Sequence, residues 1–237
     1  MNKIKQFRKK IDIIDSDILK LLNKRTELAY KIGIEKKSSN IFRPERQAYI
    51  LRNLFHLRNN KITPDIIFSY WRAIFLAQTK LQGNIKIITS KSISKPQYND
   101  ILNFFTHEVK IQGYNNINQA LKILLKNKNS LLILPYPKNK AEKDWWTDFD
   151  FSAAKIIASL PFIMKKSTKP RLIILSKYAP VLDDSSVMLY KSNKLIKNES
   201  LKIEAKAKDA YLYKSKNIIN ANNLSFIGAY PENYEIK

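Results

Sequence analysis

Apolar residues between positions 3 and 37 recur every three or four residues, and this segment has no proline and a single glycine, Gly33. The spacing predicts one helix of about 35 residues, roughly 50 Å long at ~1.5 Å per residue. Because such a helix is longer than a compact domain of this size, we expect it to pack along a second copy in a homodimer. The apolar positions are Ile4, Phe7, Ile11, Ile14, Ile18, Leu21, Leu22, Leu28, Ala29 and Ile32.

Two shorter helices are predicted next. Arg43-Pro44-Glu45 places a proline near the first turn of a helix whose apolar positions are Ile50, Leu51, Leu54 and Phe55. Thr63-Pro64-Asp65 combines an N-cap, a proline and an acidic first turn, and the helix it begins runs to Gly83. Residues 1–83 therefore read as an all-α domain of three helices.

Beyond Gly83 the pattern changes to short apolar runs that alternate with amphipathic segments. This alternation predicts a second, α/β domain over residues 84–237, with parallel strands near its start. The expected strands are 85–88, 109–111, 131–134, 171–175, 186–190, 210–214 and 224–229, and the expected helices are 98–105 and 117–125.

Composition excludes several classes of protein. Apolar residues make up 44% of the 237 residues, which is incompatible with a chain that is disordered throughout. The absence of cysteine removes disulfides and thiolate chemistry, and four glycines provide no phosphate-binding glycine loop. No signal peptide or apolar run of ~18 residues is present, so we expect a soluble, cytoplasmic protein without membrane contact. Because there is no cysteine and His56 and His107 lie far apart in the sequence, we expect no metal site.

The formal net charge of +23 favours an anionic partner. A nucleic-acid-binding protein is one alternative, although the basic residues are spread over both halves of the chain and no nucleic-acid-binding motif is present. Arginine is distributed differently: only eight of the 43 basic residues are arginine, and seven of these lie in the first 72 residues. In a chain that otherwise uses lysine, arginine indicates positions that need a planar, bidentate donor for carboxylate or phosphate.

Two cations fall on the apolar face of the first helix. Arg25 lies seven residues after Ile18 and eleven before Lys36, which places all three on one face. Arg8 lies about 80° from Lys36, at the edge of the face. Cations on an apolar face are costly unless an anion meets them. The alternative is that Arg25 pairs with Glu45 and that Lys36 is solvated.

The third helix carries Gln78 and Gln82 where apolar residues are expected, and the second helix begins with Arg46 and Gln47. Buried amides need hydrogen-bond partners, either within the core or on a ligand. Together these positions predict a small pocket rich in cations and amides without a pair of carboxylates. Such a pocket suits a dianion whose reaction requires neither a nucleophile nor an acid–base pair.

Residues 4–82 resemble the all-helical chorismate mutases, and the spacings of the cations and amides fit that family. The matching stretches are Arg8-Lys-Lys-Ile-Asp-Ile-Ile-Asp, Leu21-Leu-Asn-Lys-Arg25-Thr-Glu-Leu-Ala, Lys31-Ile-Gly33-Ile-Glu-Lys36, Phe42-Arg-Pro-Glu-Arg46-Gln, Trp71-Arg-Ala-Ile and Gln82-Gly83. The resemblance implies conversion of chorismate to prephenate by a Claisen rearrangement, in a site built from the helices of two subunits and without a cofactor.

The resemblance also assigns roles to individual residues. Arg8 of the neighbouring subunit and Arg25 would hold the two carboxylates, and Lys36 and Gln82 would donate to the ether oxygen, on which charge builds up as the C–O bond breaks. The remaining site residues would be Arg46, Gln47 and Gln78. Position 47 commonly carries Glu in this family and position 78 a small Ser, so Gln47 and Gln78 are departures from the pattern.

Residues 84–237 resemble, more weakly, a degenerate prephenate dehydratase domain found in some bacterial chorismate mutases. The likeness lies in Leu131-Leu-Ile-Leu-Pro-Tyr-Pro, Trp145-Trp146, Ala158-Ser-Leu-Pro-Phe and Phe226-Ile-Gly-Ala-Tyr. The Thr-Arg-Phe motif of a working dehydratase is absent, and residues 90–96 stand where a glycine-rich opening is expected. We therefore predict a structural or regulatory domain without dehydratase activity, such as one that senses an aromatic end product; a bifunctional enzyme with a divergent dehydratase domain is the alternative.

Overall fold

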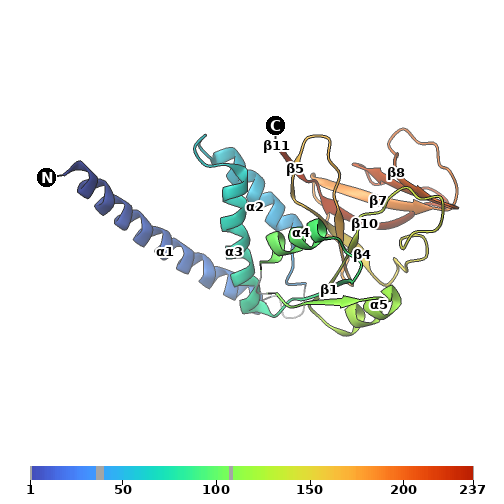
Figure 1. The fold of residues 1–237 in the computed structure, drawn as a ribbon, viewed down its shortest axis with the longest axis horizontal. Coiled ribbons are helices and arrows are strands. Elements are labelled where there is room, and N and C mark those ends of the chain that lie inside the picture. The colour runs from blue at the N-terminus through green and yellow to red at the C-terminus, as the bar shows by residue number, and fades with distance from the viewer. Residues whose placement is uncertain (1, 36–39, 107–108, 237) are drawn as a thin grey trace.

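The computed structural model describes residues 2–35, 40–106 and 109–236. Figure 1 shows an all-helical N-terminal part, followed by a large sheet with two further helices. The helices are α1 (Lys3–Glu35), α2 (Pro44–Leu57), α3 (Pro64–Gln82), α4 (Lys95–Phe105) and α5 (Ile117–Lys126). The strands are β1 (Lys86–Ser90), β2 (Ile111–Tyr114), β3 (Ser130–Pro135), β4 (Lys155–Leu160), β5 (Ile163–Lys165), β6 (Leu172–Ser176), β7 (Ser186–Ser192), β8 (Lys202–Ala207), β9 (Ala210–Ser215), β10 (Ser225–Pro231) and β11 (Tyr234–Ile236).

Helix α1 confirms the long helix predicted from the apolar spacing. It projects away from the rest of the molecule and contacts α3 near its C-terminal end (Figure 1). None of its residues is buried, and large apolar side chains such as Phe7 and Ile18 are 60% and 50% exposed. A single chain therefore leaves most of the apolar face of α1 uncovered.

Helices α2 and α3 begin where the sequence predicts. Pro44 and Pro64 occupy the first turns, where the missing N–H of proline removes no intrahelical hydrogen bond. Helix α3 ends at Gly83, whose N–H donates to the carbonyl oxygen of Thr79 at 3.1 Å. Gly83 has a φ of 154°, a conformation that favours glycine over other residues.

Within the described residues, nine strands form one mixed sheet in the order β2-β1-β3-β6-β4-β10-β7-β9-β8. Strands β2, β1 and β3 are parallel, as predicted, because α4 and α5 provide the crossover connections between them. Strands β6 to β9 pair antiparallel with their neighbours, and β10 is parallel to β4 alone. Strands β11 and β5 form a separate parallel pair.

The two faces of the sheet are covered by different parts of the chain. Alternate residues of a strand point to opposite faces, so Ile87 and Ile88 of β1 enter different apolar clusters. Helix α5 and an aromatic segment around Trp146 cover one face. Helices α2, α3 and α4 cover the other, where Phe42, Phe55 and Phe75 share a cluster with the sheet. The apolar core thus continues across residue 83.

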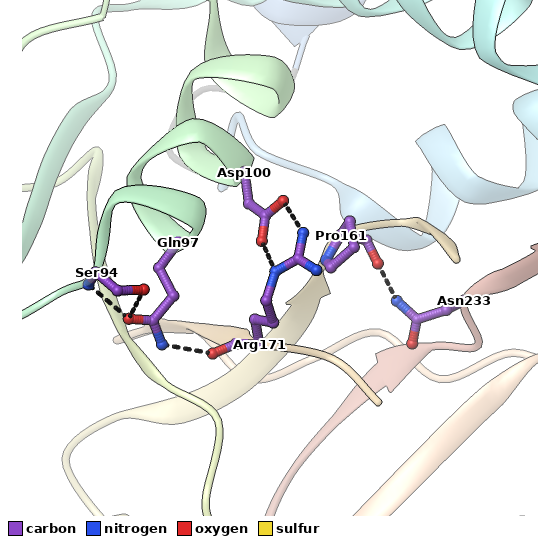
Figure 2. Close-up of polar contacts among 6 residues, drawn as sticks. All are labelled: Ser94, Gln97, Asp100, Pro161, Arg171 and Asn233. Atoms are coloured by element: carbon purple, nitrogen blue, oxygen red, sulfur yellow. Dashed lines mark hydrogen bonds and ion pairs between the residues drawn. The ribbon is translucent and has the colours of Figure 1, made fainter. Parts of the chain in front are cut away.

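Helix α4 is fixed to the sheet by the last arginine of the chain (Figure 2). The guanidinium of Arg171 donates twice to Asp100, from Nε to Oδ2 at 2.6 Å and from Nη2 to Oδ1 at 2.5 Å. The N-terminus of the helix is closed by Ser94 and Gln97 in a reciprocal capping arrangement, and the amide of Gln97 donates to the carbonyl oxygen of Arg171 at 3.1 Å. Arg171 is therefore a structural residue that connects α4 to the start of β6.

Helix α2 is also connected to the C-terminal part of the chain by polar and aromatic contacts. Nη1 of Arg52 donates to Oγ of Ser185 at 2.8 Å, and Nη2 of Arg52 donates to the carbonyl oxygen of Glu232. The rings of Phe55 and Tyr234 lie 4.5 Å apart. These contacts fix the helices of the N-terminal part to the sheet domain.

Candidate functional site

A cavity of about 340 Å³ lies among the C-terminal half of α1, the start of α2 and the C-terminal half of α3. It brings together five of the predicted site residues: Arg25, Arg46, Gln47, Gln78 and Gln82. Among the described residues, no carboxylate lines it, in agreement with the predicted pocket of cations and amides. The other lining residues are Leu28, Ala29, Ile32, Ile41, Arg43, Ile50, Phe75 and Thr79.

Arg25 is held over the cavity by α3. Its Nη1 donates to Oε1 of Gln78, a buried side chain whose Nε2 donates to Oγ1 of Thr26 at 3.2 Å. The guanidinium also lies 5.4 Å from the centre of the Phe75 ring. The alternative pairing of Arg25 with Glu45 is wrong, because the carboxylate of Glu45 accepts from Nε of its neighbour Arg43.

The charges around the cavity favour an anion. Partial burial lowers the pKa of Arg25, and the nearby positive charge of Arg46 lowers it further. Arg46 itself is exposed and lies over the ring of Tyr49 at 5.2 Å. Because the two guanidinium groups repel each other without a carboxylate between them, a bound anion would relieve both the desolvation and the repulsion.

Gln82 is placed by a close approach of α3 to α1. Its Nε2 donates to the carbonyl oxygen of Ala29 at 3.3 Å. A side chain at Gly33 would bring its Cβ to 2.7 Å from Cγ of Gln82. Gly33 therefore provides the space in which the Gln82 side chain lies against α1.

Gln47 is held by an arginine that the site prediction did not include. Its Oε1 accepts from Nη1 of Arg72, and Nε of Arg72 donates to the carbonyl oxygen of Phe104 at 2.7 Å. Arg72 is only 2% exposed, and burial lowers its pKa to about 9. Its early position in a lysine-rich chain and its place in the stretch Trp71-Arg-Ala-Ile were the sequence signals that pointed to it.

Arg8 is the one described residue of the predicted site that does not line this cavity. Arg8 is exposed on the projecting part of α1, and more than half the length of the helix separates it from Arg25. Lys36 falls outside the described residues. The described part of the chain contains no group of three or more residues suited to holding a metal ion. None of its helices has the length and apolar character needed to cross a membrane.

Helices α1, α2 and α3 form a small all-helical domain with a cavity lined by cations and amides. Residues 7–83 match the family model described as chorismate mutase type II, so the N-terminal part of this chain is a chorismate mutase type II domain. This match agrees with the resemblance that the cations and amides of the sequence indicate.

Two curated proteins are similar to parts of this chain. A bifunctional chorismate mutase/prephenate dehydratase of Aquifex aeolicus is 34% identical over 93 residues, which is 37% of this chain and 26% of that protein. A protein of the same description from Neisseria gonorrhoeae is 34% identical over 67 residues, 28% of this chain and 18% of its own length. The matches thus span about a quarter or less of these relatives. No solved structure matches the chain significantly.

Proposed function

We propose that this protein is a chorismate mutase, which converts chorismate to prephenate by an intramolecular Claisen rearrangement. The observation that carries the proposal is the cavity itself, which is lined by Arg25, Arg46 and amides, without a carboxylate among the described lining residues. It lies in the domain that matches the chorismate mutase type II model.

The reaction breaks one C–O bond and forms one C–C bond within the substrate, so no proton has to be moved. The protein therefore contributes by holding the compact reactive conformer and by stabilising the charge on the ether oxygen. Arg25 binds a carboxylate, and its hydrogen bond from Nη1 to Gln78 orients the guanidinium. Gln82 and Lys36 donate to the ether oxygen, and both bind the transition state more strongly than the ground state.

The substrate-binding residues lie at the start of α2 and on α3. Arg46 adds positive charge at the exposed edge of the cavity, and Gln47 offers an amide in place of a carboxylate. The amide of Gln78, which also lines the cavity, is hydrogen-bonded to Arg25 and Thr26. Gln78 therefore acts on the substrate mainly by orienting Arg25.

The active form is a homodimer in this proposal. The uncovered apolar face of α1 supports this proposal. A long helix with an exposed apolar face is stabilised when that face packs against another helix, here the α1 of a second copy. Arg8 of the second copy would then reach the cavity and hold the second carboxylate of the substrate. A small dianion thus meets cations from both chains.

The test is to add the full-length protein to chorismate and to follow the loss of chorismate absorbance. We expect turnover in wild type and a loss of about 100-fold or more in Arg25→Met and Lys36→Ala, because each removes a charged donor from the transition state. Lys31→Ala, a change at an exposed lysine of α1 that does not line the cavity, is the matched control. Absence of prephenate above background in wild type would refute the proposal.

We propose further that the C-terminal domain has no dehydratase activity and supports the helices structurally. The apolar core that α2 and α3 share with the sheet supports this role. The bifunctional names of the two relatives favour the alternative, a divergent dehydratase. Incubation with prephenate decides between them, since formation of phenylpyruvate above the uncatalysed rate requires a working dehydratase.

A further inference from the structure

We infer that Arg72 is a positioning residue that fixes the amide of Gln47, so that Gln47 presents its N–H donor, and not its carbonyl oxygen, to the ligand. This inference rests on the proposed function, because Gln47 lines the cavity assigned to chorismate. It makes a buried residue outside the cavity responsible for one specificity contact within it.

The guanidinium of Arg72 is held without a counterion. Its hydrogen bonds go to a carbonyl oxygen and an amide oxygen and not to a carboxylate, and burial lowers its pKa. Its partners are the carbonyl oxygen of Phe104, the Phe104 ring at 3.6 Å from Cζ, and Oε1 of Gln47. Nη2 is buried and has no hydrogen-bond partner in the described part of the chain.

Burying a charge without a counterion costs free energy of folding, and an apolar side chain would fill this position at a lower cost. A purely structural role therefore does not explain an arginine here. The gain is orientation. Because Arg72 has donors only, the group of Gln47 that faces it must be the carbonyl oxygen. The NH₂ group of Gln47 is then left for the cavity, where it can donate to an oxygen of the ligand.

Arg72 also contacts the C-terminal domain, through Phe104. Phe104 is the penultimate residue of α4, where carbonyl groups lack intrahelical partners and the helix dipole favours a cation. Arg171 and Asp100 fix the same helix to the sheet (Figure 2). Arg72 thus connects a residue of the candidate site to an element that lies beyond residue 83.

A double-mutant cycle tests whether Arg72 acts through Gln47. We expect Arg72→Met to lower kcat/KM by about three- to tenfold in wild type, the value of one lost hydrogen bond, but by less than about twofold in a Gln47→Ala background. Equal losses in both backgrounds would overturn the inference. Arg58→Met is the matched control, since Arg58 donates to the carbonyl oxygen of Phe55 and does not line the cavity.

A second measurement on the full-length protein does not depend on activity. In Gln47→Glu the new carboxylate faces Arg72 and can also accept from the unpartnered Nη2. When Arg72 is present, we expect Gln47→Glu to raise the Tm by about 2–4 °C. In the Arg72→Met background we expect Gln47→Glu to lower the Tm, because the new carboxylate then has no partner. The same Tm change in both backgrounds would overturn the contact, whereas an inactive wild type would refute only the mutase assignment.

Discussion

At the scale of single residues, arginine has two uses in this chain. Arg25 and Arg46 line the cavity, whereas Arg72 and Arg171 hold elements together. The bias towards arginine in the first 72 residues therefore predicts where a planar donor is needed, but not whether a ligand or the protein itself accepts from it. Arg171 makes a bidentate pair of the kind expected for a ligand site, and it makes it with Asp100 of the same chain.

Helical periodicity predicted that Arg25 lies on the apolar face of α1 and that Gln78 and Gln82 lie on the apolar face of α3, and these faces meet at the cavity. It could not predict that Arg72 is buried against Phe104. That contact joins α3 to α4, two segments whose relative placement depends on tertiary packing and not on local spacing.

Replacing Gly33 with alanine should impair catalysis with little loss of stability. The new Cβ would lie 2.7 Å from Cγ of Gln82 and would push that side chain away from the carbonyl oxygen of Ala29. We expect kcat to fall by about tenfold, since Gln82 is proposed to bind the transition state. Gly113→Ala is the control, because its Cβ would meet the flexible side chain of Lys91 in the other domain. Unchanged turnover in Gly33→Ala would argue against the role of Gln82.

At the scale of elements, most of the strongly apolar strands were predicted, whereas β8 and β4 were missed for different reasons. Strand β8 lies at the edge of the sheet and alternates charged with apolar residues, but its lysines, glutamate and alanines have low β-propensity. Strand β4, in contrast, lies inside the sheet but ends before Pro161, and its apolar run was not recognised as a strand. The parallel start of the sheet was predicted because helices alternate with strands there.

The ion pair that fixes α4 should contribute measurably to stability. In Asp100→Asn the amide offers one acceptor to a guanidinium that donates twice, so we expect a loss of about 1.5–3 kcal/mol in the free energy of unfolding. Urea denaturation measures it. Asp148→Asn, which removes an exposed pair with Lys143, should change stability by less than about 0.5 kcal/mol. Similar losses in the two variants would contradict the structural role of Arg171.

At the scale of the whole molecule, the sequence indicated two domains, and the structure describes helices α2 and α3 packed on the sheet. The change of pattern at Gly83 was visible in the sequence, but the shared core was not. Apolar periodicity identifies which face of a helix is buried and leaves open whether another helix, a second copy or a sheet covers it.

The uncovered face of α1 predicts a dimer that substitutions on this face disrupt. Ile11→Glu combined with Ile18→Glu places two charges on it, and neither residue is buried within one chain. We expect sedimentation to report a monomer with a marked loss of mutase activity. Lys9→Glu with Ser16→Glu, on the opposite side of the helix, should leave the dimer intact. A wild-type protein that sediments as a monomer would exclude the shared site.

Removing the C-terminal domain should destabilise the helices that remain. A chain of residues 1–83 exposes Phe42 and Phe55, which are 2% and 1% exposed in the full-length protein. We expect a lower Tm by circular dichroism and a loss of mutase activity at 37 °C, because the sheet no longer covers these rings. A truncated protein as stable and active as the full chain would show that the sheet contributes nothing to the site.

The core that continues across residue 83 limits whether the N-terminal helices can be fused to a different domain. Helices that bury their apolar side chains against a particular sheet are not an exchangeable module, since a foreign domain would have to reproduce the surface that Phe42, Phe55 and Phe75 require. The same dependence constrains the sheet: the face beneath α2 and α3 has to keep its shape for these helices to fold.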